Sequence, residues 1–184
     1  MFRKILAYGT VAGLIAGISL SAVVVAGQGH EVHYGMLIGY TTMLIALSTV
    51  FIAIKRHRDA DLGGVIGFWP ALGLGLGISF VAGIFYVLAW ETTVALTHLD
   101  FASGYAKTLI EQKKASGVSG VALAKFTAEM EQFKVQYANP FYRLPMTFIE
   151  IFPVGVLVSL ASAGLLRMSR FLPARRGVVR GTAN

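Results

Sequence analysis

The chain has 184 residues, of which 55% are hydrophobic, 14% are charged and none is cysteine, and its formal net charge is +7. A soluble domain carries about 25% charged residues, so this composition excludes a soluble enzyme and a disordered chain. The missing cysteine excludes disulfides, zinc–thiolate sites and thiol chemistry.

Long uncharged stretches predict four membrane-spanning helices, because a run of about 18 apolar residues is long enough to cross a bilayer. The predicted spans are residues 5–27, 34–54, 64–90 and 144–166. A cleavable signal peptide is a competing interpretation of the first span, but its apolar run exceeds the roughly 7–15 residues of such signals. We therefore expect one all-α, polytopic membrane domain over residues 1–170, followed by a basic tail, residues 171–184.

The distribution of Lys and Arg predicts the orientation, because short cytoplasmic loops are enriched in them. One side of the predicted membrane collects ten: Arg3, Lys4, Lys55, Arg56, Arg58, Arg167, Arg170, Arg175, Arg176 and Arg180. The long loop on the other side carries six, partly offset by acids. Both termini are therefore expected in the cytoplasm. We interpret the tail as a stop-transfer anchor rather than a lipid-binding segment, and the high pI as topology rather than nucleic-acid binding.

Small residues recur every fourth position on three of the spans. In lipid, such residues let helix backbones approach closely and so drive helix association, although glycine is also simply common in membrane helices. The expected packing positions are Gly9, Gly13, Gly17, Gly75, Ser79, Gly83, Gly155 and Ser159. The second span is bulkier, with Met43, Leu44, Leu47 and Phe51, and is expected at the lipid-facing periphery.

The insertion between the third and fourth spans, about residues 98–139, has the pattern of a helical hairpin. Apolar side chains recur every three or four residues, as on one face of an amphipathic helix: Leu123, Phe126, Met130, Phe133 and Tyr137. A shorter helix is expected around Phe101 and Tyr105, with a Ser/Gly turn at residues 116–120. We expect this extracytoplasmic hairpin to lie on the membrane surface or to cap the bundle, with Trp90, Phe141 and Tyr142 in the interfacial aromatic belt.

Two acids, Glu91 and Glu150, occupy apolar surroundings. A carboxylate in the hydrocarbon region costs about 2.5–3.5 kcal/mol on insertion scales, so such residues usually face a cavity or a partner. One interpretation is a proton-responsive or cation-binding site with both acids at similar depth. The interpretation we favour is structural, with Glu150 hydrogen-bonded to a neighbouring helix or to carbonyls freed by Pro153, and with Glu91 solvated at the interface.

A short loop places His30 and His33 close together beside an acid. With His98 from the long loop they are candidate metal ligands, although a polar loop facing water or headgroups is the interpretation we favour. The sequence contains no phosphate-binding glycine loop, nucleophile elbow or paired catalytic carboxylates, and no cofactor is expected.

The turn between the second and third spans is the most patterned segment of the chain. Its basic residues, Arg58 among them, are expected to anchor the span at the headgroups. Asp59 or Asp61 is expected to cap the next helix, and Gly63 and Gly64 to permit the reversal. Recognition of a cytoplasmic partner is the functional alternative.

Three motifs in this order carry a resemblance to a known family. They are Lys55-x-x-Arg58-Asp59-x-x-x-Gly63-Gly64-x-Ile66-x-Phe68, then Tyr137-x-Asn139-Pro140, then Thr147-x-x-Glu150-x-x-Pro153-x-Gly155. From about residue 4 to 170 the chain resembles the DUF4199 family, a widespread bacterial inner-membrane family catalogued as a four-helix domain of unknown function. The resemblance implies the four-span layout with a long external insertion, and it implies no activity and no catalytic residues.

These patterns favour a non-enzymatic structural, accessory or partner-binding membrane protein. Its expected partners are the lipid bilayer and either a second copy or another membrane protein, and no nucleic acid. Two alternatives remain open. One is a small oligomeric transporter or ion or proton pathway that uses Glu150, and the other is an extracytoplasmic metal-binding protein.

Overall fold

The structure is a computed structural model that describes the whole chain except residues 28–34, 99, 169 and 174–184. The described residues form six α-helices and no strand: α1 (Phe2–Ala26), α2 (Gly35–Asp61), α3 (Phe68–Thr97), α4 (Phe101–Ala115), α5 (Gly120–Tyr137) and α6 (Pro140–Leu166). Four of them, α1, α2, α3 and α6, are long and apolar enough to cross a membrane. The predicted all-α fold with four spans is confirmed.

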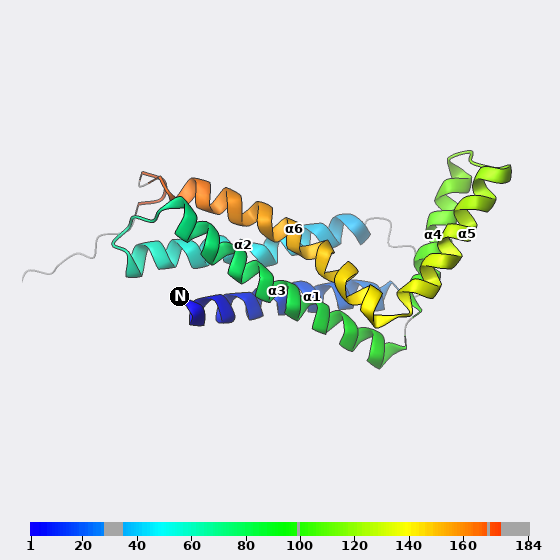
Figure 1. Cartoon of the computed structure of the whole chain (residues 1–184), viewed down its shortest axis with the longest axis horizontal. Helices are drawn as coiled ribbons and strands as arrows, with labels where there is room; N and C mark the ends of the chain where they lie inside the picture. Colours follow the sequence, from blue (N-terminus) through cyan, green and yellow to red (C-terminus); the bar gives the residue numbers. More distant parts are fainter. Residues whose placement is uncertain (28–34, 99, 169, 174–184) are drawn as a thin grey trace, which may run out of the picture.

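The four long helices form one bundle around α3 (Figure 1). Helices α1 and α6 pack against α3, while α2 packs against both α1 and α6 and closes the bundle. Half of the most apolar window of α3 is buried, against about a third or less in the other spans. Helix α3 is therefore the central element of the fold.

Close backbone contacts hold α1 and α6 against α3. A Cβ atom added to Gly9 would lie 2.6 Å from Val81 Cβ, and one added to Gly155 would lie 2.6 Å from Ser79 Cβ. The hydroxyls of Ser79 and Ser159 are hydrogen-bonded across the α3–α6 contact at 3.2 Å. The remaining expected packing positions also lie in contacts between helices. Gly13 and Gly17 of α1 face α3, while Gly75 and Gly83 of α3 face Ser159 and Phe148 of α6.

Most of the bulky side chains expected to face lipid from the second span point inward instead, although only 33% of the most apolar window of α2 is buried, the same share as in α6. Met43 and Leu47 of α2 are fully buried, Phe51 packs against the core, and only Leu44 of the four bulky residues is exposed. Small residues bring α1 and α6 close to α3, so the larger side chains of α2 supply the volume that fills the interior.

Two of the spanning helices extend well past the predicted ends of their spans. Helix α2 continues to Asp61 and α3 continues to Thr97, seven residues beyond the expected ends at 54 and 90. The last turns of α2 are polar but still helical, and Lys55 pairs with Asp59 one turn on at 2.5 Å. Hydropathy marks the limit of the apolar segment rather than the end of the helix.

Helices α4 and α5 form the hairpin, which stands at one end of the bundle and projects sideways from the bundle's long axis (Figure 1). The turn between them uses Gly117 and Gly120, whose φ angles are +84° and +59°. The apolar stripe of α5 faces α4, with the rings of Phe133 and Tyr105 5.9 Å apart. Helix α4 covers this stripe, and neither α4 nor α5 comes close to the backbones of α1, α2 or α3. Whether the hairpin lies on the membrane surface or caps the bundle stays a prediction.

Candidate functional site at the base of the hairpin

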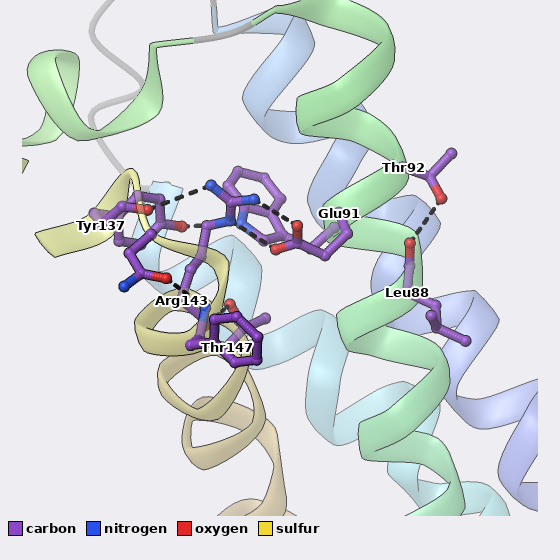
Figure 2. A network of polar contacts seen from close by, with 9 residues as sticks. Leu88, Glu91, Thr92, Tyr137, Arg143 and Thr147 are labelled. Atoms are coloured by element: carbon purple, nitrogen blue, oxygen red, sulfur yellow. Dashed lines mark hydrogen bonds and ion pairs between the residues drawn. The ribbon is translucent and has the colours of Figure 1, made fainter.

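An ion pair joins α3 to α6 where the hairpin leaves the bundle. Asn139 caps α6 by accepting a hydrogen bond from Phe141 N, which places Arg143 in the first turn of α6 opposite the end of α3. The Arg143 guanidinium donates to both carboxylate oxygens of Glu91 at 2.6 and 2.5 Å (Figure 2). The side chains are only 12% and 23% exposed, so Glu91 is paired and not solvated as expected.

The same arginine also binds the end of the hairpin. Its Nη1 donates to the carbonyl of Tyr137 at 3.3 Å, and its own carbonyl accepts from the Thr147 hydroxyl at 3.0 Å (Figure 2). The Tyr137 hydroxyl accepts a hydrogen bond from Trp90 Nε1 at 2.9 Å. Burial raises the pKa of Tyr137 to about 12, so this phenol is neutral and keeps its proton at neutral pH.

Aromatic rings pack around this network. Phe101 lies between Trp90 and Tyr137, with ring centroids 5.1 and 5.7 Å away. The expectation for Trp90 is wrong, because the residue is 3% exposed and its ring joins the hairpin to the bundle instead of facing the interface. Phe141, in contrast, is 86% exposed and Tyr142 is also exposed, which leaves both rings available to the membrane interface.

A cleft of about 260 Å³ opens beside the network. It lies between the end of α3, the start of α4 and the junction of α5 with α6, and it is lined by Val94, His98, Asp100, Phe101, Ala102, Lys134, Tyr137, Ala138 and Arg143. The cleft thus combines two cationic side chains, one carboxylate and aromatic walls. The sequence did not predict that Asp100, Lys134 and Arg143 lie close together. The opposite charges of Glu91 and Arg143 at adjoining ends of two spans could have predicted their ion pair.

Glu150 lies apart from this network. It is seven residues beyond Arg143 on α6, which at 1.5 Å per residue is about 10 Å deeper in the bundle, so the expectation of similar depth for Glu91 and Glu150 is wrong. Its side chain is exposed at the surface of the chain. The buried Tyr86 hydroxyl lies near it, yet that hydroxyl has no hydrogen-bond partner among the described residues. The described part of the chain likewise gives Glu150 no bond to a carbonyl near Pro153.

Of the three candidate metal ligands, only His98 lies among the described residues. His98 ends α3 in a left-handed conformation, with φ +50°, and lines the cleft with Asp100. His30 and His33 lie outside the described residues. Within the described ranges no three His, Asp or Glu side chains gather as a metal site would require, and the histidine cluster stays a prediction.

Arg58, at the opposite end of the bundle, is fully buried. Its guanidinium donates to Asp59 Oδ1 at 2.7 Å and to the carbonyls of Phe171 and Leu172 at 2.9 and 2.5 Å. A longer bond of 3.4 Å reaches the carbonyl of Leu166, the last residue of α6. Arg58 therefore ties α2 to the segment after α6, instead of anchoring the span at the headgroups. The usable signal was its place four residues after Ile54 on the buried face of α2.

The expected capping of the third span by Asp59 or Asp61 is wrong. Both acids belong to the end of α2, and Gly67 precedes α3 without any side-chain cap. Asp61 pairs instead with His57 at 2.6 Å and with Lys4 of α1. The reversal itself is made by Gly63 and Gly64, with φ angles of +64° and +94°.

These features define a class of protein: an all-α membrane protein with four spans and a helical hairpin between the third and the fourth. The family model described as "Protein of unknown function (DUF4199)" matches residues 7–168. The chain belongs to this family, as the sequence resemblance predicted. No curated protein and no solved structure matches the chain.

Proposed function

We propose that the chain is a non-enzymatic accessory membrane protein that binds another transmembrane helix, from a second copy or from a different protein, through the face of α6 around Glu150. The observation that carries this proposal is an intramembrane carboxyl group exposed at the surface of the chain, which has the Tyr86 hydroxyl near it but is not hydrogen-bonded to that hydroxyl. Such a group facing lipid costs about 2.5–3.5 kcal/mol, and a donor from a partner helix removes that cost.

The surroundings of Glu150 fit a helix-binding face. Residues two apart on a helix point about 200° apart, so Glu150 points away from Phe148 and Phe152, whose rings pack near Phe80 of α3. Ile149, its neighbour, is 66% exposed. An apolar surface with one central hydrogen-bonding group is a common arrangement where transmembrane helices associate.

The orientation belongs to the same proposal. The N-terminus of α1, the α2–α3 turn and the C-terminal end of α6 lie at one end of the bundle, and the hairpin lies at the other (Figure 1). The first end holds Lys4, Lys55 and Arg56, which supports a cytoplasmic location for that end and for both termini in a bacterial inner membrane. The hairpin is then extracytoplasmic.

Site-specific photocrosslinking in native membranes tests the helix-binding face. A photoreactive residue at position 149 is expected to give one discrete crosslinked species, and the same residue at Ile45, 64% exposed on α2, is expected to give none. Glu150→Leu should abolish the species formed from position 149. A monodisperse monomer without a crosslink from position 149 would contradict the proposal.

A second candidate, an oligomeric proton or ion pathway, is supported by the buried and unpaired Tyr86 hydroxyl near Glu150. Buried polar groups are normally hydrogen-bonded, so this hydroxyl and the acid form a polar position in the outer half of the bundle. Reconstituted protein should then show a proton flux that Glu150→Gln removes. Equal flux in the two proteins would eliminate this candidate.

A further inference from the structure

The cleft at the hairpin base carries charges of both signs. Lys134 of α5 and Arg143 of α6 line one part of it, and Asp100, which precedes α4, lines another. Phe101 and Tyr137 form apolar walls between them. A ligand for this cleft therefore has to match two cations and one anion at short range.

Several donors in the cleft are not fully used by the described residues. A guanidinium has five N–H groups, and the bonds of Arg143 to Glu91 and to the Tyr137 carbonyl occupy three of them. Lys134 pairs with Glu131 at 2.9 and 3.1 Å, which leaves at least one of its three N–H groups. The neutral Tyr137 hydroxyl accepts from Trp90 and still has a proton to donate.

Asp100 supplies the acceptor. Its Oδ1 accepts from Ser103 N at 3.1 Å, which caps α4, and an ionised carboxylate has about four lone-pair sites, so it can accept another bond. Hydrogen bonds from Ser103 hold the pKa of Asp100 below its usual range, with Lys134 contributing less. The carboxyl group is therefore ionised at neutral pH.

The charge balance selects the class of ligand. Glu91 already neutralises Arg143 and Glu131 neutralises Lys134, so a simple anion would gain little net attraction and would meet Asp100. A simple cation would bind Asp100 alone and would leave the spare N–H groups of Lys134 and Arg143 without an acceptor. A zwitterion uses both sets, because its anionic group accepts from the spare N–H groups and its ammonium donates to Asp100.

The position and the size of the cleft narrow the choice further. A hydrocarbon core of about 30 Å needs about 20 helical residues, and Arg143 lies in the first turn of the 27-residue α6, at the level of the lipid headgroups. A volume of about 260 Å³ is below the range of about 300–1,000 Å³ for pockets that enclose drug-sized ligands, and suits one headgroup.

We propose that this cleft binds phosphoethanolamine, a phosphate ester with a primary ammonium, as the headgroup of a membrane phospholipid. The phosphate accepts hydrogen bonds from Lys134, Arg143 and the Tyr137 hydroxyl, and the ammonium donates to Asp100. Free phosphoethanolamine has the same chemistry, so the experiment has to separate the lipid from the soluble ester.

Native mass spectrometry of the full chain in neutral detergent provides the test, with lipid binding measured over a concentration series. Phosphatidylethanolamine is expected to bind about tenfold more tightly than phosphatidylcholine, whose methylated ammonium has no N–H to donate, or phosphatidylglycerol, which has no ammonium. Equal binding of the three lipids would overturn the proposal. Free phosphoethanolamine is expected to compete only weakly, and competition as tight as the lipid itself would overturn the lipid assignment in favour of the soluble ester.

Matched variants locate the site. Lys134→Gln should weaken phosphatidylethanolamine binding about tenfold, Lys134→Arg should retain it, and Lys125→Gln, on the same helix but outside the cleft, should leave it unchanged. Asp100→Asn keeps a helix-capping side chain, so α4 should stay folded while the preference for phosphatidylethanolamine over phosphatidylcholine is lost. The proposal fails if Lys134→Gln and Lys125→Gln bind alike, with circular dichroism showing both to be folded.

Discussion

Replacing Arg58 with alanine should release the segment that follows α6. The side chain is fully buried and donates to Asp59 and to the carbonyls of Phe171 and Leu172. A hydrogen bond to a charged group contributes about 1.5–3 kcal/mol, and the loss stays near that size because Asp59 keeps Lys55 as a partner. We expect the free energy of unfolding to fall by about that amount, a large share of the roughly 5–15 kcal/mol of a typical domain.

Unfolding in detergent mixed with sodium dodecyl sulfate measures this loss, and limited proteolysis after Phe171 shows whether the segment detaches. Arg56→Ala is the matched control, because Arg56 is exposed and its hydrogen bond to the Tyr8 hydroxyl is open to solvent. Arg58→Lys should fall between the wild type and Arg58→Ala, since an ammonium keeps the charge but lacks the planar fork of donors. If Arg58→Ala unfolds and is cleaved like Arg56→Ala, the reasoning is refuted.

Three further predictions concern packing, pH and the hairpin base. Gly155→Ala should destabilise the bundle by about 1–3 kcal/mol in the same unfolding assay, because its Cβ would lie 2.6 Å from the facing serine of α3. Gly73→Ala, whose Cβ would have no atom within 4 Å, should be neutral. Equal effects of the two substitutions would contradict the close α3–α6 packing. Because the pKa of Asp100 is lowered, its contribution to the stability of α4 is complete above the usual carboxyl pKa and is lost as the pH falls through the lowered value. The protection of α4 amides against exchange should therefore fall in that pH range. If Asp100→Asn showed the same pH dependence of protection as the wild type, the role of this carboxyl group would be contradicted. Glu91→Gln should leave Arg143 with a buried, unbalanced charge and should speed amide exchange at the α5–α6 junction but not at the α2–α3 turn. An equal change in exchange at both places would argue against the ion pair as the link between α3 and the base of the hairpin.

The spans were predictable because lipid imposes a strong constraint on sequence. A chain that crosses the hydrocarbon region needs about 20 apolar residues per helix, and the charge-free stretches of the sequence meet that requirement. The hairpin was also visible, since the spacing of Phe126, Met130 and Phe133 depends only on local helical geometry. Its placement was not, because that spacing does not say whether lipid or α4 covers the stripe.

The polar contacts were less predictable, because they join residues that are far apart in the chain. Arg143 pairs with Glu91 across 52 positions, and Arg58 binds carbonyls 113 and 114 positions away. The acceptors of Arg58 are backbone groups, which leave no trace in side-chain patterns. The same limit explains why Asp59 was assigned to the wrong helix, since a polar end of α2 and a cap of α3 have similar composition.

We expect the chain to cross a membrane four times, with the hairpin on one side and the α2–α3 turn on the other. The chain has no cysteine, so single cysteines at exposed Gln112 in α4 and at exposed Leu62 after α2 can be labelled without background. In intact cells with a permeabilised outer envelope, a membrane-impermeant maleimide should label position 112 at once and position 62 only after the inner membrane is disrupted. Labelling of both positions before disruption would contradict the account.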